Sequence, residues 1–318
     1  MILNALSAVL MVFIIMAVGY FMGKGGWAGP EVTSFISKFI TNITVPFTIV
    51  YTFISSIPGK ELAGSWAYIA ASFISIIIAV VIGKLVARAA KVDAKRRGIF
   101  ICLFAFSNSI FIGLPIATAI FGEGALLYAI YYYVANTVMM NSLGVIELER
   151  DRCAIQGDSS GTSARLVVKS LLKPPLLAAV AGIALSLLGV TEDMLPDFLT
   201  SALRYVGNIT SPLALIFVGM ALHRMGISCI KRIDKPLALS LVGRFIVSPL
   251  TMILATALFG IHGQPAHILT IQMSLPAMIS ISIYSENIGA DTDFAARGIV
   301  VSTLLSFVTI PLYILILT

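Results

Sequence analysis

The sequence has 318 residues, of which 58% are hydrophobic and only 11% are charged, and its mean hydropathy is +1.00. This composition excludes a soluble globular domain, which could not bury so much apolar surface in one core, and it predicts a membrane protein. The net charge of +6 does not indicate a nucleic-acid-binding protein, because the basic residues lie between apolar segments and not on one polar face.

Ten apolar segments follow one another along the chain, each close to the roughly 20 residues that a helix needs to cross the hydrocarbon layer. They lie near 2–23, 34–57, 66–88, 98–121, 125–146, 171–190, 196–222, 236–260, 266–288 and 295–317. The first has no basic stretch ahead of it and no small-residue cleavage site, so we interpret it as a membrane helix and not as a removable signal peptide. The sequence therefore predicts an all-α membrane protein with ten transmembrane helices.

The longest polar interval separates the first five segments from the last five. It contains a stretch of Gly, Ser and Thr at 157–163, which is typical of a flexible linker. We predict a first five-helix repeat at 1–146, a cytoplasmic linker at 147–170 and a second five-helix repeat at 171–318.

Most Lys and Arg residues lie in the odd-numbered connections between these segments. Cytoplasmic loops of membrane proteins carry such an excess of positive charge. The pattern predicts a multi-pass protein of the bacterial inner membrane, with the odd connections in the cytoplasm and both termini on the external side.

The second and seventh segments share a short motif, Asn42-Ile43-Thr44-Val45-Pro46 in one and Asn208-Ile209-Thr210-Ser211-Pro212 in the other. Because each half has an odd number of helices, the two copies would cross the membrane in opposite directions. Inverted repeats of this kind are typical of secondary transporters. The two prolines could also simply kink their helices, with Asn42 and Asn208 covering the freed carbonyls.

The fourth and ninth segments both contain helix-breaking residues near their centres. The fourth has Ser107-Asn108-Ser109 followed by Gly113 and Pro115, and the ninth has Gln272 followed by Pro276. Proline removes one backbone N–H and displaces a carbonyl, which is tolerated in lipid only where other groups satisfy the backbone. We predict two broken helices near the membrane midplane, where discontinuous helices form the substrate sites of many transporters.

A helix that restarts after such a break presents backbone N–H groups and a partial positive charge, which favours an anionic substrate. Asn108 can donate its side-chain amide to a carboxylate. The predicted substrate-binding residues are Ser107, Asn108, Ser109, Gly113, Pro115, Pro276, Ala277 and Ser280, and the candidates for ion coupling or support are Gln272, Glu286, Asn42 and Asn208. The serines could instead satisfy a kinked backbone or join helices, and Glu286 could be an acid at the membrane interface.

The sequence favours no enzymatic reaction. It has no HExxH, no Gly-x-Ser-x-Gly elbow and no phosphate-binding Gly loop, and Cys102, Cys153 and Cys229 show no CxxC spacing. We therefore predict a protein without catalytic residues, cofactor, metal site or disulfide.

Taken together, these motifs resemble the auxin efflux carrier family, which includes bacterial malate-permease-like and malonate-carrier-like proteins and the plant auxin exporters. The matching stretches are Val45-Pro46-Phe47, Asn108 to Pro115, Asn208 to Pro212, Leu275-Pro276 and Ser302-Thr303. The resemblance implies that the fourth and ninth helices cross at their broken centres in a mobile transport domain of helices 3–5 and 8–10. Helices 1, 2, 6 and 7 would form a scaffold through which members dimerise.

The resemblance also implies roles for single residues. Asn108 matches the asparagine that contacts the substrate carboxylate, and Pro276 matches the crossover proline of the ninth helix. Two positions differ from the plant members: Ser107 stands where they have proline, and the third segment carries only Lys84 where they have an acid and a lysine.

We therefore expect a secondary transporter of small mono- or dicarboxylates in the lipid bilayer, working by alternating access with an elevator-like motion. Two alternatives stay open. One is a sodium-coupled transporter resembling the bile-acid symporters, and the other is a membrane sensor that binds a ligand without moving it.

Overall fold

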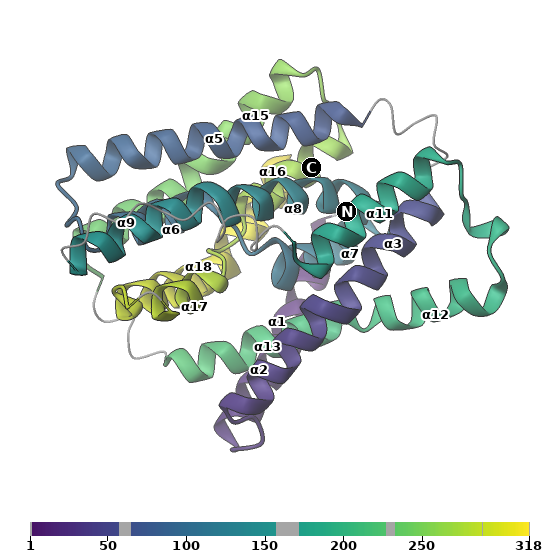
Figure 1. The fold of residues 1–318 in the computed structure, drawn as a ribbon, viewed down its shortest axis with the longest axis horizontal. Coiled ribbons are helices and arrows are strands. Elements are labelled where there is room, and N and C mark those ends of the chain that lie inside the picture. Colours follow the sequence, from purple (N-terminus) through teal and green to yellow (C-terminus); the bar gives the residue numbers. More distant parts are fainter. Residues whose placement is uncertain (1, 57–64, 157–171, 227–232, 288, 318) are drawn as a thin grey trace. The chain divides into compact units, whose positions relative to one another are not determined.

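The computed structural model describes residues 2–56, 65–156, 172–226, 233–287 and 289–317. Every regular element in this described part is a helix (Figure 1), which confirms the predicted all-α class. By its internal contacts the chain divides into two compact units. Unit 1 comprises Met1–Ile69, Ile110–Val134 and Leu172–Arg224, and unit 2 comprises Ala70–Ser109, Ala135–Leu171 and Met225–Thr318.

The helices fall close to the ten predicted apolar segments. In the first half of the chain they are α1 (Ile2–Lys24), α2 (Pro30–Phe39), η1 (Ile40–Thr44), α3 (Val45–Ser56), α5 (Trp66–Ala89), α6 (Arg97–Ala105), η2 (Ser109–Gly113), α7 (Leu114–Phe121), α8 (Ala125–Met139), η3 (Met140–Gly144) and α9 (Val145–Gln156). In the second half they are α11 (Pro174–Leu187), η4 (Glu192–Met194), α12 (Asp197–Asn208), α13 (Thr210–Met225), α14 (Lys235–Val242), η6 (Gly243–Val247), α15 (Ser248–Leu258), α16 (Gln264–Ser274), α17 (Ser280–Asn287) and α18 (Thr292–Leu317).

The fifth helical stretch is longer than predicted. Helix α9 continues it through Gln156, so residues 147–156 of the predicted linker are helical. The rest of that linker, 157–170, lies outside the described residues.

Four helices of the described part are long and apolar enough to cross a membrane: Trp66–Ala89, Asp197–Met225, Lys235–Leu258 and Thr292–Leu317. Shorter apolar helices occur at Leu10–Lys24, Ser109–Phe121 and Pro174–Leu187. The chain is therefore a multi-pass membrane protein, while ten crossings and an inverted repeat stay predictions.

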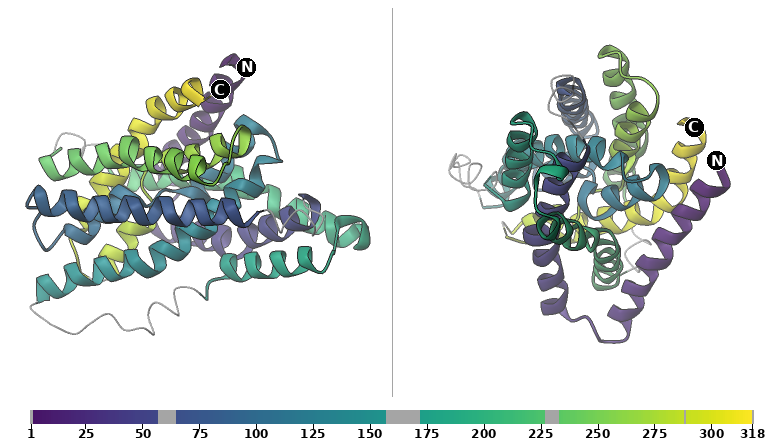
Figure 2. Two further views of the ribbon diagram at one scale, coloured as in Figure 1. Left: turned by 90° about the horizontal axis from the view of Figure 1, so that it is seen from above. Right: turned by 90° about the vertical axis from the view of Figure 1, so that its right-hand side faces the viewer.

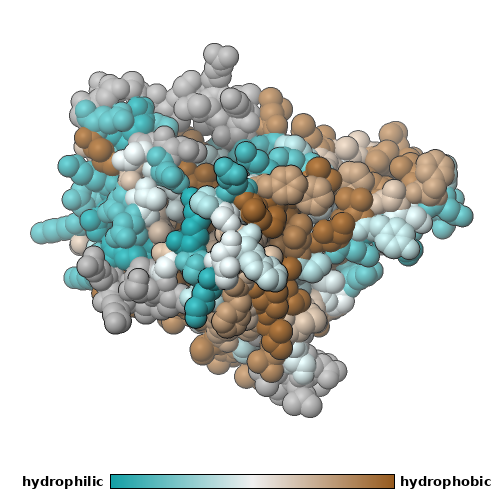
Figure 3. All heavy atoms as spheres, turned by 90° about the horizontal axis from the view of Figure 1, so that it is seen from below, coloured by the Kyte–Doolittle hydropathy of each residue, from teal (hydrophilic) through white to brown (hydrophobic). Residues whose placement is uncertain are grey.

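Exposed apolar side chains cover broad areas of the surface, which appear brown in the space-filling view (Figure 3). On α15, Leu250, Leu254 and Leu258 are 56%, 62% and 72% exposed. Their spacing of four residues places them on one face of the helix. A leucine stripe of this kind suits contact with lipid acyl chains.

Three prolines inside apolar segments follow directly after a π-helical turn. The turns η1, η2 and η6 precede Pro46, Pro115 and Pro249, each of which is the second residue of the next α-helix. Proline has no backbone N–H. In the first turn of an α-helix this removes no hydrogen bond, because the N–H groups of that turn have no partner within the helix. The wider π turn thus lets the chain continue as a helix where proline would otherwise interrupt it.

In unit 1, α3 packs against α11 and α12. Its Thr48 hydroxyl lies 2.8 Å from the Thr210 hydroxyl and donates to the Gly207 carbonyl at 3.0 Å. Helices α1 and α13 approach closely at Gly219, where an added Cβ would lie 1.9 Å from the carbonyl oxygen of Met16. Small residues permit such close helix contacts in membrane proteins.

In unit 2, α6 is buried among α9, α14 and α18. The Ser248 hydroxyl at the start of α15 donates to the Phe104 carbonyl of α6 at 2.8 Å. Helix α15 also lies alongside α5 (Figures 1 and 2), where the hydroxyls of Ser75 and Thr251 are 3.0 Å apart. Unit 2 is therefore organised around the first half of the fourth segment.

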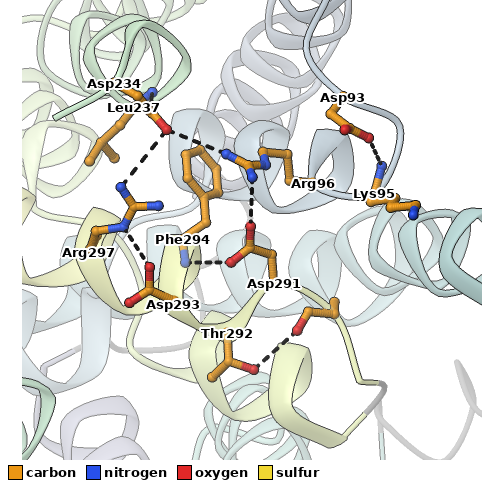
Figure 4. Close-up of polar contacts among 11 residues, drawn as sticks. Asp93, Lys95, Arg96, Asp234, Leu237, Asp291, Thr292, Asp293, Phe294 and Arg297 are labelled. Atoms are coloured by element: carbon orange, nitrogen blue, oxygen red, sulfur yellow. Dashed lines mark hydrogen bonds and ion pairs between the residues drawn. The ribbon is translucent and has the colours of Figure 1, made fainter. Parts of the chain in front are cut away.

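A group of ion pairs joins three connections at one end of unit 2 (Figure 4). The Arg96 guanidinium pairs with Asp234 at 3.4 Å and with Asp291 at 3.2 Å, and Arg297 lies 3.9 Å from Asp234. Asp234 also accepts the Leu237 N–H and so caps α14. These contacts hold the starts of α6, α14 and α18 together.

Candidate functional site

The fourth segment is broken at residues 106–108. Helix α6 ends at Ala105, Phe106 has extended backbone angles, and the π turn η2 restarts the helix at Ser109. The sequence had pointed to Gly113 and Pro115, and this position was wrong: both lie in the restarted helix. The π turn places Pro115 in the first turn of α7, so this proline does not need to break the chain.

The ninth segment is broken at the predicted Pro276. Helix α16 ends at Ser274, Leu275 has φ −65° and ψ 159°, and α17 begins at Ser280. Both segments are therefore interrupted, the fourth at another position than the one predicted, and both breaks belong to unit 2.

The two breaks lie side by side and form an isolated antiparallel β-bridge. The backbone N–H of Asn108 donates to the carbonyl of Pro276 at 2.8 Å, and the N–H of Met278 donates to the carbonyl of Phe106 at 3.2 Å. Each break thus satisfies backbone groups that the other leaves without a helical partner, as buried backbone requires.

Two buried side chains support this bridge from neighbouring helices. The Asn136 amide of α8 donates to the Ser107 carbonyl at 2.8 Å and to the Ser109 hydroxyl at 3.1 Å, and its oxygen accepts the Ser107 N–H at 3.3 Å. On α18, the Ser302 hydroxyl accepts the Ala277 N–H at 3.1 Å. The geometry of the breaks is therefore fixed by side chains on the fifth and tenth helical stretches.

These bonds involve part of the backbone at which we expect the anion site. The N–H groups of Ser107, Asn108, Ser109, Ala277 and Met278 all donate within the protein, so these five backbone donors are already used. Asn108 is 1% exposed and Ser107 and Ser109 are fully buried.

A buried positive charge lies next to the ninth break. Arg244, in the π turn of the eighth segment, is 0% exposed, and its guanidinium donates to the carbonyl of Met273 in the last turn of α16. The carbonyl end of a helix carries a partial negative charge, which favours a cation there. Arg244 therefore satisfies a carbonyl at the end of α16. Its charge also makes the local electrostatic potential more positive, which favours an anion.

A polar cavity of about 360 Å³ lies within unit 1. Its polar lining is dominated by hydroxyls and contains Thr48, Tyr51, Thr52, Ser55, Thr118, Glu123, Asn208, Thr210 and Ser211. Among the described residues that line it, none is basic, so this lining differs from that of an anion site.

A family model described as membrane transport protein matches residues 4–314. The chain belongs to the auxin efflux carrier family. This carrier is 25% identical over 326 residues to an uncharacterized transporter of Methanothermobacter thermautotrophicus, covering 99% of both chains. It is 24% identical to an uncharacterized transporter of Methanocaldococcus jannaschii, covering 97% of both. A probable auxin efflux carrier component 9 of Oryza sativa is 26% identical over 47% of this chain and 36% of the plant protein.

The resemblance read from the sequence is thus confirmed, and the family is one of membrane transporters, not enzymes. Of the predicted site residues, the structure brings together Ser107, Asn108, Ser109, Pro276 and Ala277 at the bridge.

Other predicted residues of this carrier lie elsewhere. In unit 2, Ser280 is half-buried at the start of α17, Glu286 is exposed on the same helix, and Gln272 is buried in α16. Gly113, Pro115, Asn42 and Asn208 belong to unit 1, where Asn42 and Asn208 are exposed.

Sequence reasoning missed Asn136 and Arg244 as site residues. Arg244 is the single charged residue of its apolar segment, and an isolated charge at membrane depth is itself a signal of function. Arg244 within 236–260 was therefore detectable, whereas the contacts of Asn136 with the fourth break depend on the packing of α8.

Proposed function

We propose that this carrier moves small mono- or dicarboxylates across the bacterial inner membrane by alternating access. The observation that carries the proposal is the pair of bridged breaks in unit 2, with buried amide and hydroxyl groups on the fourth segment and the Arg244 charge beside the ninth. Discontinuous helices meeting in this way form substrate sites in other secondary transporters.

We assign the carboxylate contact to Asn108, whose side-chain amide can donate to a carboxylate oxygen. Ser107 and Ser109 add hydroxyls beside it, and Arg244 supplies long-range attraction that is strong in a low-dielectric interior. Two plant relatives are named as auxin efflux carriers, which supports a small organic molecule as the cargo.

The motion is proposed to be elevator-like, with helices 3–5 and 8–10 moving against a scaffold of helices 1, 2, 6 and 7 that also forms a homodimer. The basic odd connections support an orientation with both termini outside. An epitope tag at either terminus should be cleaved by protease added to intact spheroplasts, and protection of both tags would contradict the orientation.

The function is tested by flux through the purified carrier in proteoliposomes, measured for a panel of radiolabelled mono- and dicarboxylates. We expect Asn108→Ala to abolish transport of the accepted acid. Thr256→Ala is the control, because Thr256 is equally buried in unit 2 but bonds only within its own helix. Unchanged transport by Asn108→Ala would contradict the site, and binding without flux would indicate the sensor alternative.

The coupling ion is tested in the same vesicles. A requirement for a Na⁺ gradient would favour the sodium-coupled alternative, and stimulation by a pH gradient alone would favour proton coupling.

A further inference from the structure

A second cavity, of about 290 Å³, lies within unit 2 and is rich in charge. We call it the inner pocket. Its charged lining residues are Lys84 and Arg88 of α5, Arg97 of α6, and Glu147, Arg150 and Asp151 of α9. Four bases and two acids leave an excess of positive charge.

The two carboxyl groups of the inner pocket already have partners within the protein. Glu147 pairs with Lys84 Nζ at 2.7 Å and with the Arg150 guanidinium at 2.6 Å. Asp151 accepts the backbone N–H groups of Gly98 and Ile99, at 2.7 and 3.0 Å, in the first turn of α6.

Two guanidinium groups of the inner pocket do not form ion pairs with these carboxyl groups. Within the described ranges, neither Arg88 nor Arg97 has a carboxylate within 4.0 Å, and the buried Arg97 Nε has no hydrogen-bond partner. A terminal nitrogen of the Arg97 guanidinium, Nη2, donates to the Val92 carbonyl at 3.0 Å, and this bond orients the guanidinium. A buried N–H donor without a partner is unfavourable, so a bound acceptor would stabilise this site.

We propose that the inner pocket binds a phosphate group. Paired guanidiniums match the oxygens of phosphate with parallel N–H donors, as a point charge on lysine does not. The volume lies just below the range of about 300–1,000 Å³ typical of drug-sized ligands, so a phosphate with a small substituent fits better than a nucleotide.

Two sources supply this chemistry at the predicted cytoplasmic side. One is the headgroup of an anionic phospholipid in the inner leaflet, for which basic pockets between membrane helices are typical sites. The other is a soluble phosphate monoester. Because α6 runs from the inner pocket to the break at 106–108, a bound phosphate would hold the start of the helix that leads to Asn108.

The proposal is tested by thermal unfolding of the full chain in neutral detergent, with ligand added at constant ionic strength. The probes are glycerol 3-phosphate and a short-chain phosphatidylglycerol, with sodium chloride as the reference. We expect at least one probe to raise the midpoint of unfolding in a saturable way, as binding to the folded state requires.

Arg88→Gln should weaken that binding about tenfold, because it removes a charge-assisted hydrogen bond, and Arg97→Gln should do the same. Arg88 is exposed, so its variant keeps the test valid if Arg97→Gln fails to fold. Arg204→Gln, an identical change in unit 1, should bind like the wild type. A response to the lipid alone identifies a headgroup site, and a response to glycerol 3-phosphate identifies a site open to soluble ligands. Absence of any specific response, or equal binding by Arg88→Gln and the wild type, would overturn the proposal.

Discussion

The stability of unit 2 should depend on the protonation of Asp151. This side chain lies on α9, beyond the fifth apolar segment, and is 1% exposed. Burial raises its pKa from the ordinary 3.8 to about 7, and the nearby Glu147 carboxylate acts in the same direction. The bonds from the Gly98 and Ile99 N–H groups and the charge of Arg97 oppose this shift of the pKa.

The sign of the effect follows from the protons that each state binds. Between pH 3.8 and about 7 the folded protein keeps the Asp151 proton while the unfolded chain has lost it. The free energy of unfolding therefore falls as the pH rises through this window. The whole interval corresponds to about 4 kcal/mol, since one pKa unit is about 1.36 kcal/mol. The part between pH 5 and pH 8 is about 2–3 kcal/mol.

The assay compares thermal unfolding of the wild type and Asp151→Asn in detergent from pH 5 to pH 8. The variant carries a neutral amide at every pH, so all other titrating groups cancel in the comparison. We expect the wild type to lose stability relative to the variant as the pH rises. A difference that stays constant across this range, or that changes in favour of the wild type, would refute the reasoning.

Three substitutions test the helix packing within the two units. Asn136→Ala should destabilise the carrier by about 1–3 kcal/mol, because it leaves buried backbone groups of the fourth break unsatisfied; calorimetry checks the stability and vesicle flux should fall with it. Gly98→Ala should destabilise by about 1–3 kcal/mol, since its Cβ would lie 2.1 Å from the Glu147 carbonyl oxygen; unaltered thermal unfolding would contradict this contact. Gly219→Ala should lower the unfolding temperature of unit 1 for the same reason, whereas Gly29→Ala, with open space around it, should leave it unchanged.

The sequence predicted well those features that local chemistry decides. Apolar length located the helices, and Pro276 located the ninth break, because Leu275 is extended immediately before it. The family followed from motifs spread along the chain. These signals need no knowledge of which helices touch.

The position of the fourth break could not be predicted in the same way. Pro115 was the strongest local signal, but the π turn η2 accommodates it without a break. The chain opens instead at Phe106 to Asn108, where the ninth segment supplies backbone partners more than 160 residues away in sequence. The roles of Asn136 and Arg244 depend on the same long-range packing, so their identity alone did not reveal their contacts.

The sequence positions of the charged residues could be read directly, but their ion-pair partners depend on long-range packing. Counting Lys and Arg in the connections identified a predicted inner side, but the count ignored the acids. In unit 2 the bases Arg96 and Arg297 pair with Asp234, Asp291 and Asp293, so they stabilise contacts between helices. Arg88 and Arg97 lack such partners within the described residues, and for that reason they are the stronger candidates for a ligand.

The bridge between the two breaks also constrains any transport motion. In a membrane interior, separating the breaks would leave the carbonyls of Phe106 and Pro276 and two N–H groups without partners, at a cost of several kcal/mol for each group. A motion that carries both breaks together keeps all these bonds. For the proposed transport motion we therefore expect the two breaks to move together, with α6, α16 and α17 displaced as one body.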